Sequence, residues 1–407
     1  MQRVAQFWLV LHLTGSGVAL GLTAALQSLP VLVFGTVGGL VADRVDKRLL
    51  LMVTQASSGV LGLVLAGITL TGVVQLWMVY VLALCLGIIN IYDTPARQSF
   101  VTEMVGPGQV PNAVGLNSAV FTSSRMIGPA IAGVLISVVG TGWCFLYNGL
   151  SFFAVVAALR LMRPSELHRP PPVRRSRGQI REGLRYAWDR PKLRIPLVLL
   201  IVSGTFAFNW NVVLPLMARY TFHSGAETFG AMLSMIGVGA FAGALFAAGR
   251  AVPTYRLFVY AALIFSATML GAAVAPTLAL VMVALIPMGM AMTTFQVTGN
   301  SLLQLNTNPA FRGRVMSLYV LAFMGTTPIG SPIVGWVSQQ FGARTGLALG
   351  AIVTLGAAAV ALPWLHRFDA IHVDRELGAQ RVDLENPTDH PIRIAALPQA
   401  RPFVRPK

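Results

Sequence analysis

A succession of long apolar runs is the feature that most limits how this chain can fold. A helix needs about 20 predominantly apolar residues to cross the hydrocarbon core of a bilayer. Charged residues make up 11% of the chain, against about 25% in soluble domains. We therefore predict an all-α membrane protein with eleven complete spans, at about 17–41, 50–70, 75–92, 113–138, 142–161, 194–216, 226–248, 256–274, 276–299, 314–338 and 345–365.

The first residues form a shorter apolar run. Residues 1–13 are apolar after Arg3 but cannot cross a bilayer alone. We expect them to be the second half of a first span, which would make the first helix truncated. The alternative is that Met1 is the true start and that the first helix begins in mid-membrane. The chain would then be a non-functional, truncated protein.

A short repeat indicates how the spans are organised. Residues 127–140, IGPAIAGVLISVVG, and residues 329–342, IGSPIVGWVSQQFG, share I-G-x-x-I-x-G and a closing glycine. The offset is 202 residues, almost half of the 407-residue chain. Related halves are common in secondary transporters. We predict a bundle over 1–161, a basic linker over 162–193, a second bundle over 194–365 and a partly disordered tail over 366–407.

The basic residues lie between the apolar runs and set the orientation. Arg44, Lys47 and Arg48 follow the span at 17–41, and eleven basic residues lie in the linker when Arg160 at its edge is included. By the positive-inside rule the linker, the tail and both termini are cytoplasmic. This pattern accounts for the net charge of +16 without a nucleic-acid partner. The partner that it indicates is the lipid bilayer.

The linker contains one amphipathic segment. Ile180, Leu184 and Trp188 recur every four residues beside a stripe formed by Arg177, Arg181 and Arg185. Such a helix can lie on the cytoplasmic leaflet, with Trp188 at the headgroups and its arginines on anionic lipid. It can equally pack on the loops of the protein itself. The sequence does not decide between these two placements.

The segment after the first complete span carries a family resemblance. Gly39-Leu-Val-Ala-Asp43-Arg44-Val-Asp-Lys47-Arg48 resembles the signature between the second and third spans of the major facilitator superfamily, with Asp46 where glycine is usual. The resemblance implies a major facilitator fold of two pseudo-symmetric six-helix bundles. It also implies that this segment holds the cytoplasmic face shut by exchangeable ion pairs. The alternative is that the basic residues of this segment only fix the orientation of the chain in the membrane.

A second stretch narrows the resemblance. Tyr-Asp93-Thr-Pro95-Ala-Arg97-Gln-Ser-Phe, followed by the helix from Asn117 to Gly133, is similar to the enterobactin-exporter and macrolide-efflux branch, over residues 1 to about 365. The gating residues indicated by these segments and the loop charges are Gly39, Asp43, Arg44, Lys47, Arg48, Asp93, Arg97, Arg312 and Arg314.

The repeated motif supplies candidate hinge or packing positions. Gly128, Pro129 and Gly133 resemble an antiporter signature, and Gly330 and Gly335 belong to the second copy. Proline removes a helical hydrogen bond and small residues permit close helix approach. Ordinary helix packing is the alternative interpretation.

Arg125 lies about thirteen residues into its span, near the bilayer midplane. An intramembrane arginine costs about 2.5–3.5 kcal/mol on insertion scales and should face the protein interior. It can bind an anionic substrate group or couple charge, or it can form a fixed pair with helix-end carbonyls or polar side chains. The residues that we expect to line a substrate cavity are Arg125, Asn117, Phe121, Asn209, Trp210 and Gln296.

These features predict a transporter and not an enzyme. The sequence has no HExxH, P-loop or G-x-S-x-G motif and no metal-spaced histidines, so no cofactor is expected. We expect proton-driven efflux of amphipathic molecules, of drug or siderophore type, by a monomer in the bacterial cytoplasmic membrane. No Asp or Glu lies in the interior of a predicted span, so Asp93 is the candidate coupling group. The alternative is an importer of a small polar or anionic solute.

Overall fold

Helices account for nearly all of the computed structural model. It describes residues 1–407 except 43, 169–178, 251, 310 and 386–407. Within the described part there is no strand. The first half of the chain forms α1 (Gln2–Thr14), α2 (Gly17–Ala42), α3 (Lys47–Leu70), α4 (Leu76–Glu103), α5 (Val110–Val139) and α6 (Thr141–Leu161). Residues Met1–Leu362 form one compact unit.

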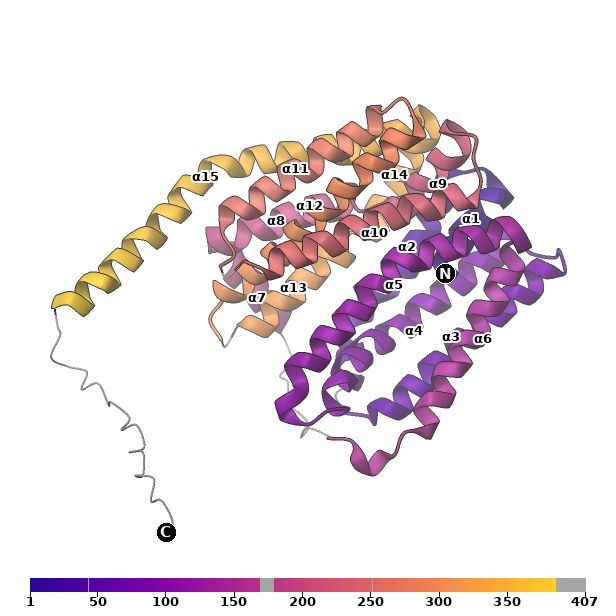
Figure 1. The fold of residues 1–407 in the computed structure, drawn as a ribbon, viewed down its shortest axis with the longest axis horizontal. Coiled ribbons are helices and arrows are strands. Elements are labelled where there is room, and N and C mark those ends of the chain that lie inside the picture. The colour runs from indigo at the N-terminus through magenta and orange to yellow at the C-terminus, as the bar shows by residue number, and fades with distance from the viewer. Residues whose placement is uncertain (43, 169–178, 251, 310, 386–407) are drawn as a thin grey trace, which may run out of the picture. The chain divides into compact units, whose positions relative to one another are not determined.

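The second half begins with a linker helix, α7 (Gln179–Trp188). It continues with α8 (Pro191–Phe206), α9 (Trp210–Leu216), a π-helical turn (Met217–Thr221), α10 (Ala226–Ala248), α11 (Tyr255–Val274), α12 (Leu278–Leu305), α13 (Arg312–Met324), α14 (Thr327–Phe341) and α15 (Ala343–Glu385). Figure 1 shows the long helices running side by side in both halves. Residues 363–407 form a second unit, of which the described part is the end of α15; residues 386–407 of the predicted tail lie outside the description.

The eleven predicted spans are confirmed. Eleven helical segments of the described chain are long and apolar enough to cross a membrane, and α1 with its 13 residues is not among them. Two segments are interrupted where the sequence analysis expected continuous helices. Non-helical residues Ala207–Asn209 separate α8 from α9, and Gly325 and Thr326 separate α13 from α14. Proline at the second position of α14 favours a new helix start there.

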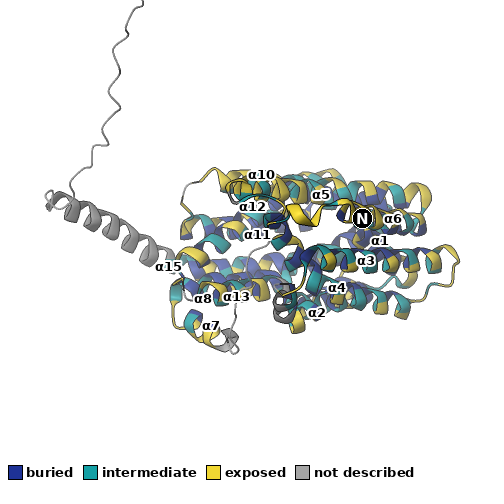
Figure 2. Cartoon of the chain, turned by 90° about the horizontal axis from the view of Figure 1, so that it is seen from below, coloured by how far each residue is buried: buried dark blue, intermediate teal, exposed yellow. Residues whose placement is uncertain are grey.

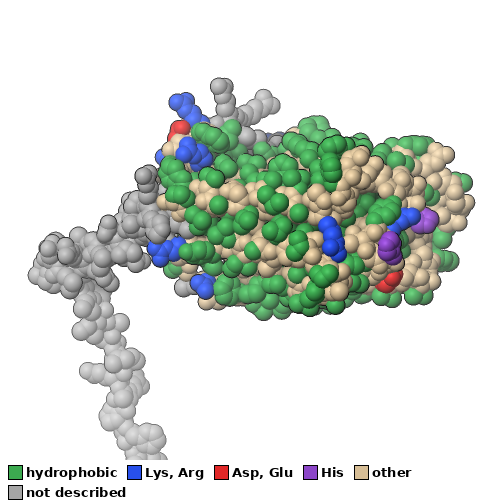
Figure 3. Space-filling model, turned by 90° about the horizontal axis from the view of Figure 1, so that it is seen from above, with side chains coloured by type: hydrophobic (Ala, Val, Ile, Leu, Met, Phe, Trp, Pro, Cys, Tyr) green, Lys and Arg blue, Asp and Glu red, His purple; other side chains and the backbone are tan. Residues whose placement is uncertain are grey.

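The largest buried core cluster is built mainly from α1, α2, α9, α10, α11 and α12. Phe7, Phe229 and Phe265 are among its largest fully buried side chains. Many residues on the outside of the helices are exposed (Figure 2), and large apolar residues are numerous among them. The face shown in Figure 3 is dominated by hydrophobic side chains. A surface of this kind suits a lipid environment, because so much apolar surface exposed to water would favour aggregation of the protein.

Candidate functional site

Two pairs of helices join the halves, and glycine makes both close. In α5, the Cβ of an alanine at Gly133 would lie 2.7 Å from the Ala226 carbonyl oxygen of α10. In α14, the Cβ of an alanine at Gly335 would meet the Gly17 carbonyl oxygen of α2. Gly133 and Gly335 are equivalent positions of the sequence repeat, 202 residues apart. The repeat therefore corresponds to two equivalent helix crossings.

Gly133 and Gly335 lie in the last two turns of α5 and α14, towards the end of the bundle opposite the linker helix, and the α5–α10 contact continues inward to Met126, which faces Gly237. Hydrogen bonds add to the closure there. The Gln339 amide oxygen on α14 accepts from the Ser16 hydroxyl (2.7 Å) and from the Val18 backbone N–H (3.1 Å). The Arg219 guanidinium donates to the Leu11 carbonyl at the end of α1 (2.9 Å). We refer to this end as the closed end.

The linker-side half of α5 is exposed on nearly all of its faces (Figure 2). Phe121 is 62% exposed and Leu116 is 67% exposed. Asn117 and Arg125 are exposed as well, and the Arg125 guanidinium carbon lies 5.8 Å from the centre of the Phe121 ring. Because these residues are four positions apart, three predicted substrate residues share one side of α5.

The other three predicted substrate residues take part in packing of the second half. The Asn209 side chain is buried and accepts from the Ser331 hydroxyl of α14 (2.6 Å). Trp210 is half-buried, with its ring 6.0 Å from that of Phe265. Gln296 on α12 is half-buried, and its backbone carbonyl accepts from the Tyr319 hydroxyl (3.5 Å). These contacts do not bring the three to the α5 group.

The predicted gating residues of the first half form contacts within that half. Lys47 and Glu103 form a buried ion pair between α3 and α4, with side chains 10% and 4% exposed. Arg48 donates to the Leu159 and Arg160 carbonyls at the end of α6 (2.6 and 2.9 Å), where a cation complements the helix dipole. The sequence analysis missed Glu103, because the basic signature alone does not show which distant carboxylate faces it.

Asp93 lies at the centre of a polar cluster. Its Oδ1 accepts from the Thr54 hydroxyl (2.8 Å) and the Gln55 amide (2.6 Å) of α3, and its Oδ2 accepts from Arg97 (2.7 Å). The side chain is 9% exposed. Of the remaining first-half candidates, Arg44 is exposed, Gly39 lies in the last turns of α2, and Asp43 lies outside the described residues.

Of the two predicted gating residues in the second half, Arg314 meets the linker helix. Arg314 pairs with Glu182 of α7 (2.9 Å), while Arg312 is exposed. The ring of Tyr186 stacks on that of Phe311 at 4.2 Å, and its hydroxyl accepts from the Asn308 backbone N–H (3.1 Å). Helix α7 is therefore packed on the protein itself.

The amphipathic stripe of the linker is described only in part. Leu184 and Trp188 remain 50% and 55% exposed in this arrangement. Arg177 lies outside the described residues, and nothing is described of the side chains of Ile180 and Arg181. The exposed Leu184 and Trp188 leave contact between this helix and a leaflet as a prediction.

The remaining hinge candidates differ in their surroundings. A Cβ at Gly330 would meet the Thr205 carbonyl of α8, whereas a Cβ at Gly128 would meet nothing within 4 Å. The Pro129 carbonyl oxygen faces Gly230 of α10. Four of the five positions therefore lie at helix contacts, and Gly128 lies beside open space.

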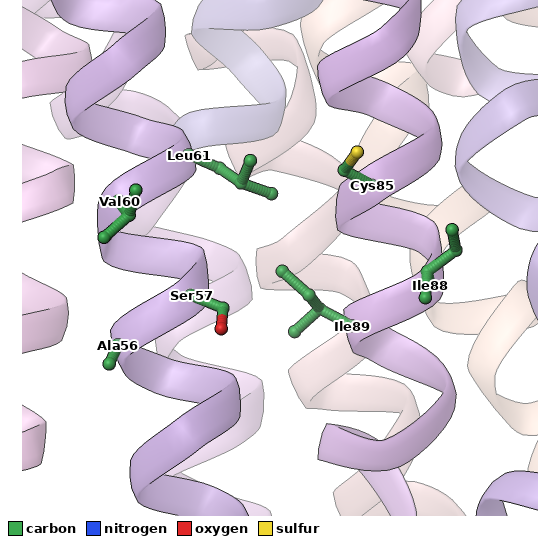
Figure 4. Close-up of a pocket in the computed structure, with 7 residues that line it drawn as sticks. All are labelled: Ala56, Ser57, Val60, Leu61, Cys85, Ile88 and Ile89. Atoms are coloured by element: carbon green, nitrogen blue, oxygen red, sulfur yellow. The ribbon is translucent and has the colours of Figure 1, made fainter.

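A shallow hollow of about 500 Å³ lies between α3 and α4. Figure 4 shows its side chains projecting from both helices, with Ser57 and Cys85 as the polar or polarisable members of an apolar lining. It contains no predicted site residue. Within the described residues, no group of His, Cys, Asp and Glu could hold a metal ion.

Comparisons with known proteins agree with this architecture. The chain is 28% identical over 396 residues to the multidrug efflux pump Tap of Mycobacterium tuberculosis, covering 92% of this chain and 93% of that protein. It is 24% identical over 344 residues to the staphyloferrin A transporter of Staphylococcus aureus, covering 82% and 84%. These relatives are transporters and not enzymes.

Solved structures show the same fold. The nucleoside transporter NupG superposes with a TM-score of 0.67 at 13% identity, over 89% of this chain and 96% of that one. An inward-facing bacterial homologue of the lysosomal transporter Spinster gives 0.65 at 14% identity, over 90% and 92%. The profile of the transmembrane secretion effector family matches residues 1–390. The chain therefore belongs to this family of major facilitator superfamily transporters.

Proposed function

We propose that the chain exports amphipathic small molecules across the bacterial cytoplasmic membrane, using a proton gradient. The observation that carries the proposal is the difference between the two ends of the bundle. The halves are packed through glycine at the closed end, and α5 is exposed at the linker side. Rigid packed crossings at one end and free helix surface at the other are what alternating access requires.

The proposed working parts follow the predicted domains. In this proposal the bundles 1–161 and 194–365 rock against each other, and the linker and the tail are on the cytoplasmic side, where basic residues gather. A monomer suffices, because the path lies between its own halves. The efflux direction is supported by the relatives that are named as multidrug efflux pumps.

Everted membrane vesicles test transport and its direction. We expect vesicles that contain the chain to accumulate an amphipathic dye, and a protonophore to abolish the accumulation. Right-side-out vesicles serve as the opposing control. Accumulation there, and not in everted vesicles, would show an importer. Absence of transport of dyes, macrolides and siderophores in either orientation would contradict the proposal.

Asp93 is the proposed proton-coupling group. Its carboxylate is buried and shares hydrogen bonds with neutral and cationic donors, so its protonation would loosen the α3–α4 contact. We expect Asp93→Asn to lose accumulation against a gradient by at least about tenfold while retaining downhill exchange. Asp189→Asn, at an exposed position after α7, is the matched control. Full accumulation by Asp93→Asn would place the coupling group elsewhere.

A further inference from the structure

Helix α7 of the linker turns one face towards the second half of the chain. Glu182 pairs with Arg314 (2.9 Å), and a Cβ at Gly183 would lie 2.8 Å from the Arg314 Cβ. The Tyr186 ring stacks at 4.2 Å on the ring of the residue before α13, and Ala187 is 1% exposed. With 3.6 residues per turn, these four positions of α7 span about 140° of its circumference. This part of the helix surface is therefore committed to the protein.

The opposite face of α7 points away from the second half. Leu184, Arg185 and Trp188 fall within about 100° of the circumference, centred on the side opposite the first face. Leu184 and Trp188 are 50% and 55% exposed, and Arg185 is exposed as well. The Arg194 guanidinium carbon lies 5.9 Å from the centre of the Trp188 ring. Two apolar side chains and two arginines therefore form one surface, and we call these four residues the outward surface.

The position of Trp188 in the chain sets the depth of the outward surface in the membrane. The membrane-spanning segment Pro191–Thr221 begins three residues after Trp188, and Arg194 lies in its first turn. Figure 1 shows α7 at the end of the second half, beside α8 and α13. Tryptophan is enriched at the level of lipid headgroups, because its ring is apolar and its N–H needs a polar partner. The outward surface therefore lies at the headgroup level of the leaflet on the linker side.

The charge around the outward surface is positive. Residues 179–194 include five basic and two acidic side chains. Of the two acidic side chains, Glu182 is already paired with a basic residue of α13, and Asp189 is exposed. Arg185 and Arg194 adjoin the tryptophan from two different helices. Basic residues at this depth are attracted to anionic lipids more than to zwitterionic ones.

We propose that the outward surface binds the headgroup of an anionic phospholipid. Arg185 and Arg194 contact the phosphate, and Leu184 and Trp188 lie between the upper parts of the acyl chains. A free phosphate ion would engage the arginines but leave both apolar side chains in water, so the surface suits a lipid better. The site is independent of what the protein transports and in which direction. Since the other face of α7 is packed on α13, a lipid held here is attached to the second half of the chain.

Fluorescence quenching of Trp188 tests the proposal on the full chain in lipid nanodiscs. The probes are phosphatidylglycerol and phosphatidylcholine, each brominated near the headgroup end of its acyl chains and present at the same mole fraction. The Trp188 signal is the difference between each protein and its Trp188→Phe version, because the chain has seven tryptophans. We expect brominated phosphatidylglycerol to quench Trp188 at least about twofold more strongly than brominated phosphatidylcholine does.

Three double variants show whether the two arginines cause this preference. Arg185→Gln/Arg194→Gln should be quenched equally by the two lipids. Arg185→Lys/Arg194→Lys should keep the preference, because lysine retains the charge. Arg163→Gln/Arg250→Gln, at two exposed positions outside the outward surface, is the control for lost charge and should keep the preference as well.

Four results would overturn the site. If neither lipid quenches Trp188, its side chain lies in water and not in the leaflet. Equal quenching by the two lipids in the wild type would show no selectivity for an anionic headgroup. A preference that survives in Arg185→Gln/Arg194→Gln would place the anionic lipid on other residues. Inorganic phosphate that abolishes the preference at constant ionic strength would identify a free anion, and not a lipid, as the occupant.

Discussion

Helices α5 and α14 carry the two copies of the repeated motif, and they differ at their linker-side ends. Each presses its central glycine against a partner helix, and each ends at a glycine with positive φ, Gly140 at 88° and Gly342 at 92°. Helix α5 is continuous over 30 residues. The corresponding span in the second half breaks before α14, and its linker-side part, α13, packs against α7 and α8.

This difference shows that the halves are equivalent at the two glycine crossings and unequal at the linker-side ends of the same helices. The linker helix covers α13 of the second half through Tyr186 and Glu182. The equivalent part of α5 has no such cover among the described residues, and its exposed side holds Arg125. The shared crossings serve the fold, and the unequal ends carry the candidate chemistry.

Replacing the central glycine at either helix crossing should have the largest effect on the stability of the folded protein. We expect Gly133→Ala and Gly335→Ala each to destabilise the folded protein by about 1–3 kcal/mol, because the added methyl group meets a backbone carbonyl that cannot move aside. Thermal unfolding in detergent measures this loss. Gly271→Ala on α11, where a Cβ meets nothing within 4 Å, is the control and should be neutral or stabilising. Loss at only one of the two crossings would show that they are not equivalent.

The packing of α7 on α13 should depend more on the stacked rings of Tyr186 and Phe311 than on the ion pair of Glu182 with Arg314. Tyr186→Ala removes the ring stack and a hydrogen bond, so we expect it to weaken the attachment of α7 by about 1–2 kcal/mol. Glu182→Gln should change it by about 0–1 kcal/mol, because Glu182 is 58% exposed. Hydrogen exchange of the α7 amides reports both changes. A larger effect from Glu182→Gln would reverse this ranking.

A smaller difference exists at the closed end. Gln339 bonds to α2 across the crossing, whereas the equivalent Ser137 donates to the Val134 carbonyl of its own helix (2.9 Å). Gln339→Ala should lose about 1 kcal/mol, which would speed hydrogen exchange at the Val18 amide by about fivefold. Ser137→Ala should leave exchange in α10 unchanged. Equal changes in both variants would mean that Gln339 adds nothing specific to the α14–α2 pair.

The spans and the repeat could be predicted because hydrophobicity and small-residue spacing act locally along the chain. The breaks at Ala207–Asn209 and at Gly325 could not, because the surrounding runs are apolar on both sides. Pairs such as Lys47 with Glu103 join residues 56 positions apart, and one sequence does not indicate such partners. Arg125 was visible as a charge in an apolar run, but its contact with the Phe121 ring became apparent only from the structure.

The connections at the closed end are very short. Gly140 alone joins α5 to α6, Gly342 alone joins α14 to α15, and the longest connection there, 71–75, has five residues. Proteases and antibodies engage flexible segments of several residues. This end therefore offers them little to recognise, and a peptide tag inserted at Gly140 or Gly342 would disrupt two helices at once. With the linker on the cytoplasmic side, as we propose, reagents that report on the protein in intact cells would have to recognise the surface of these tight turns.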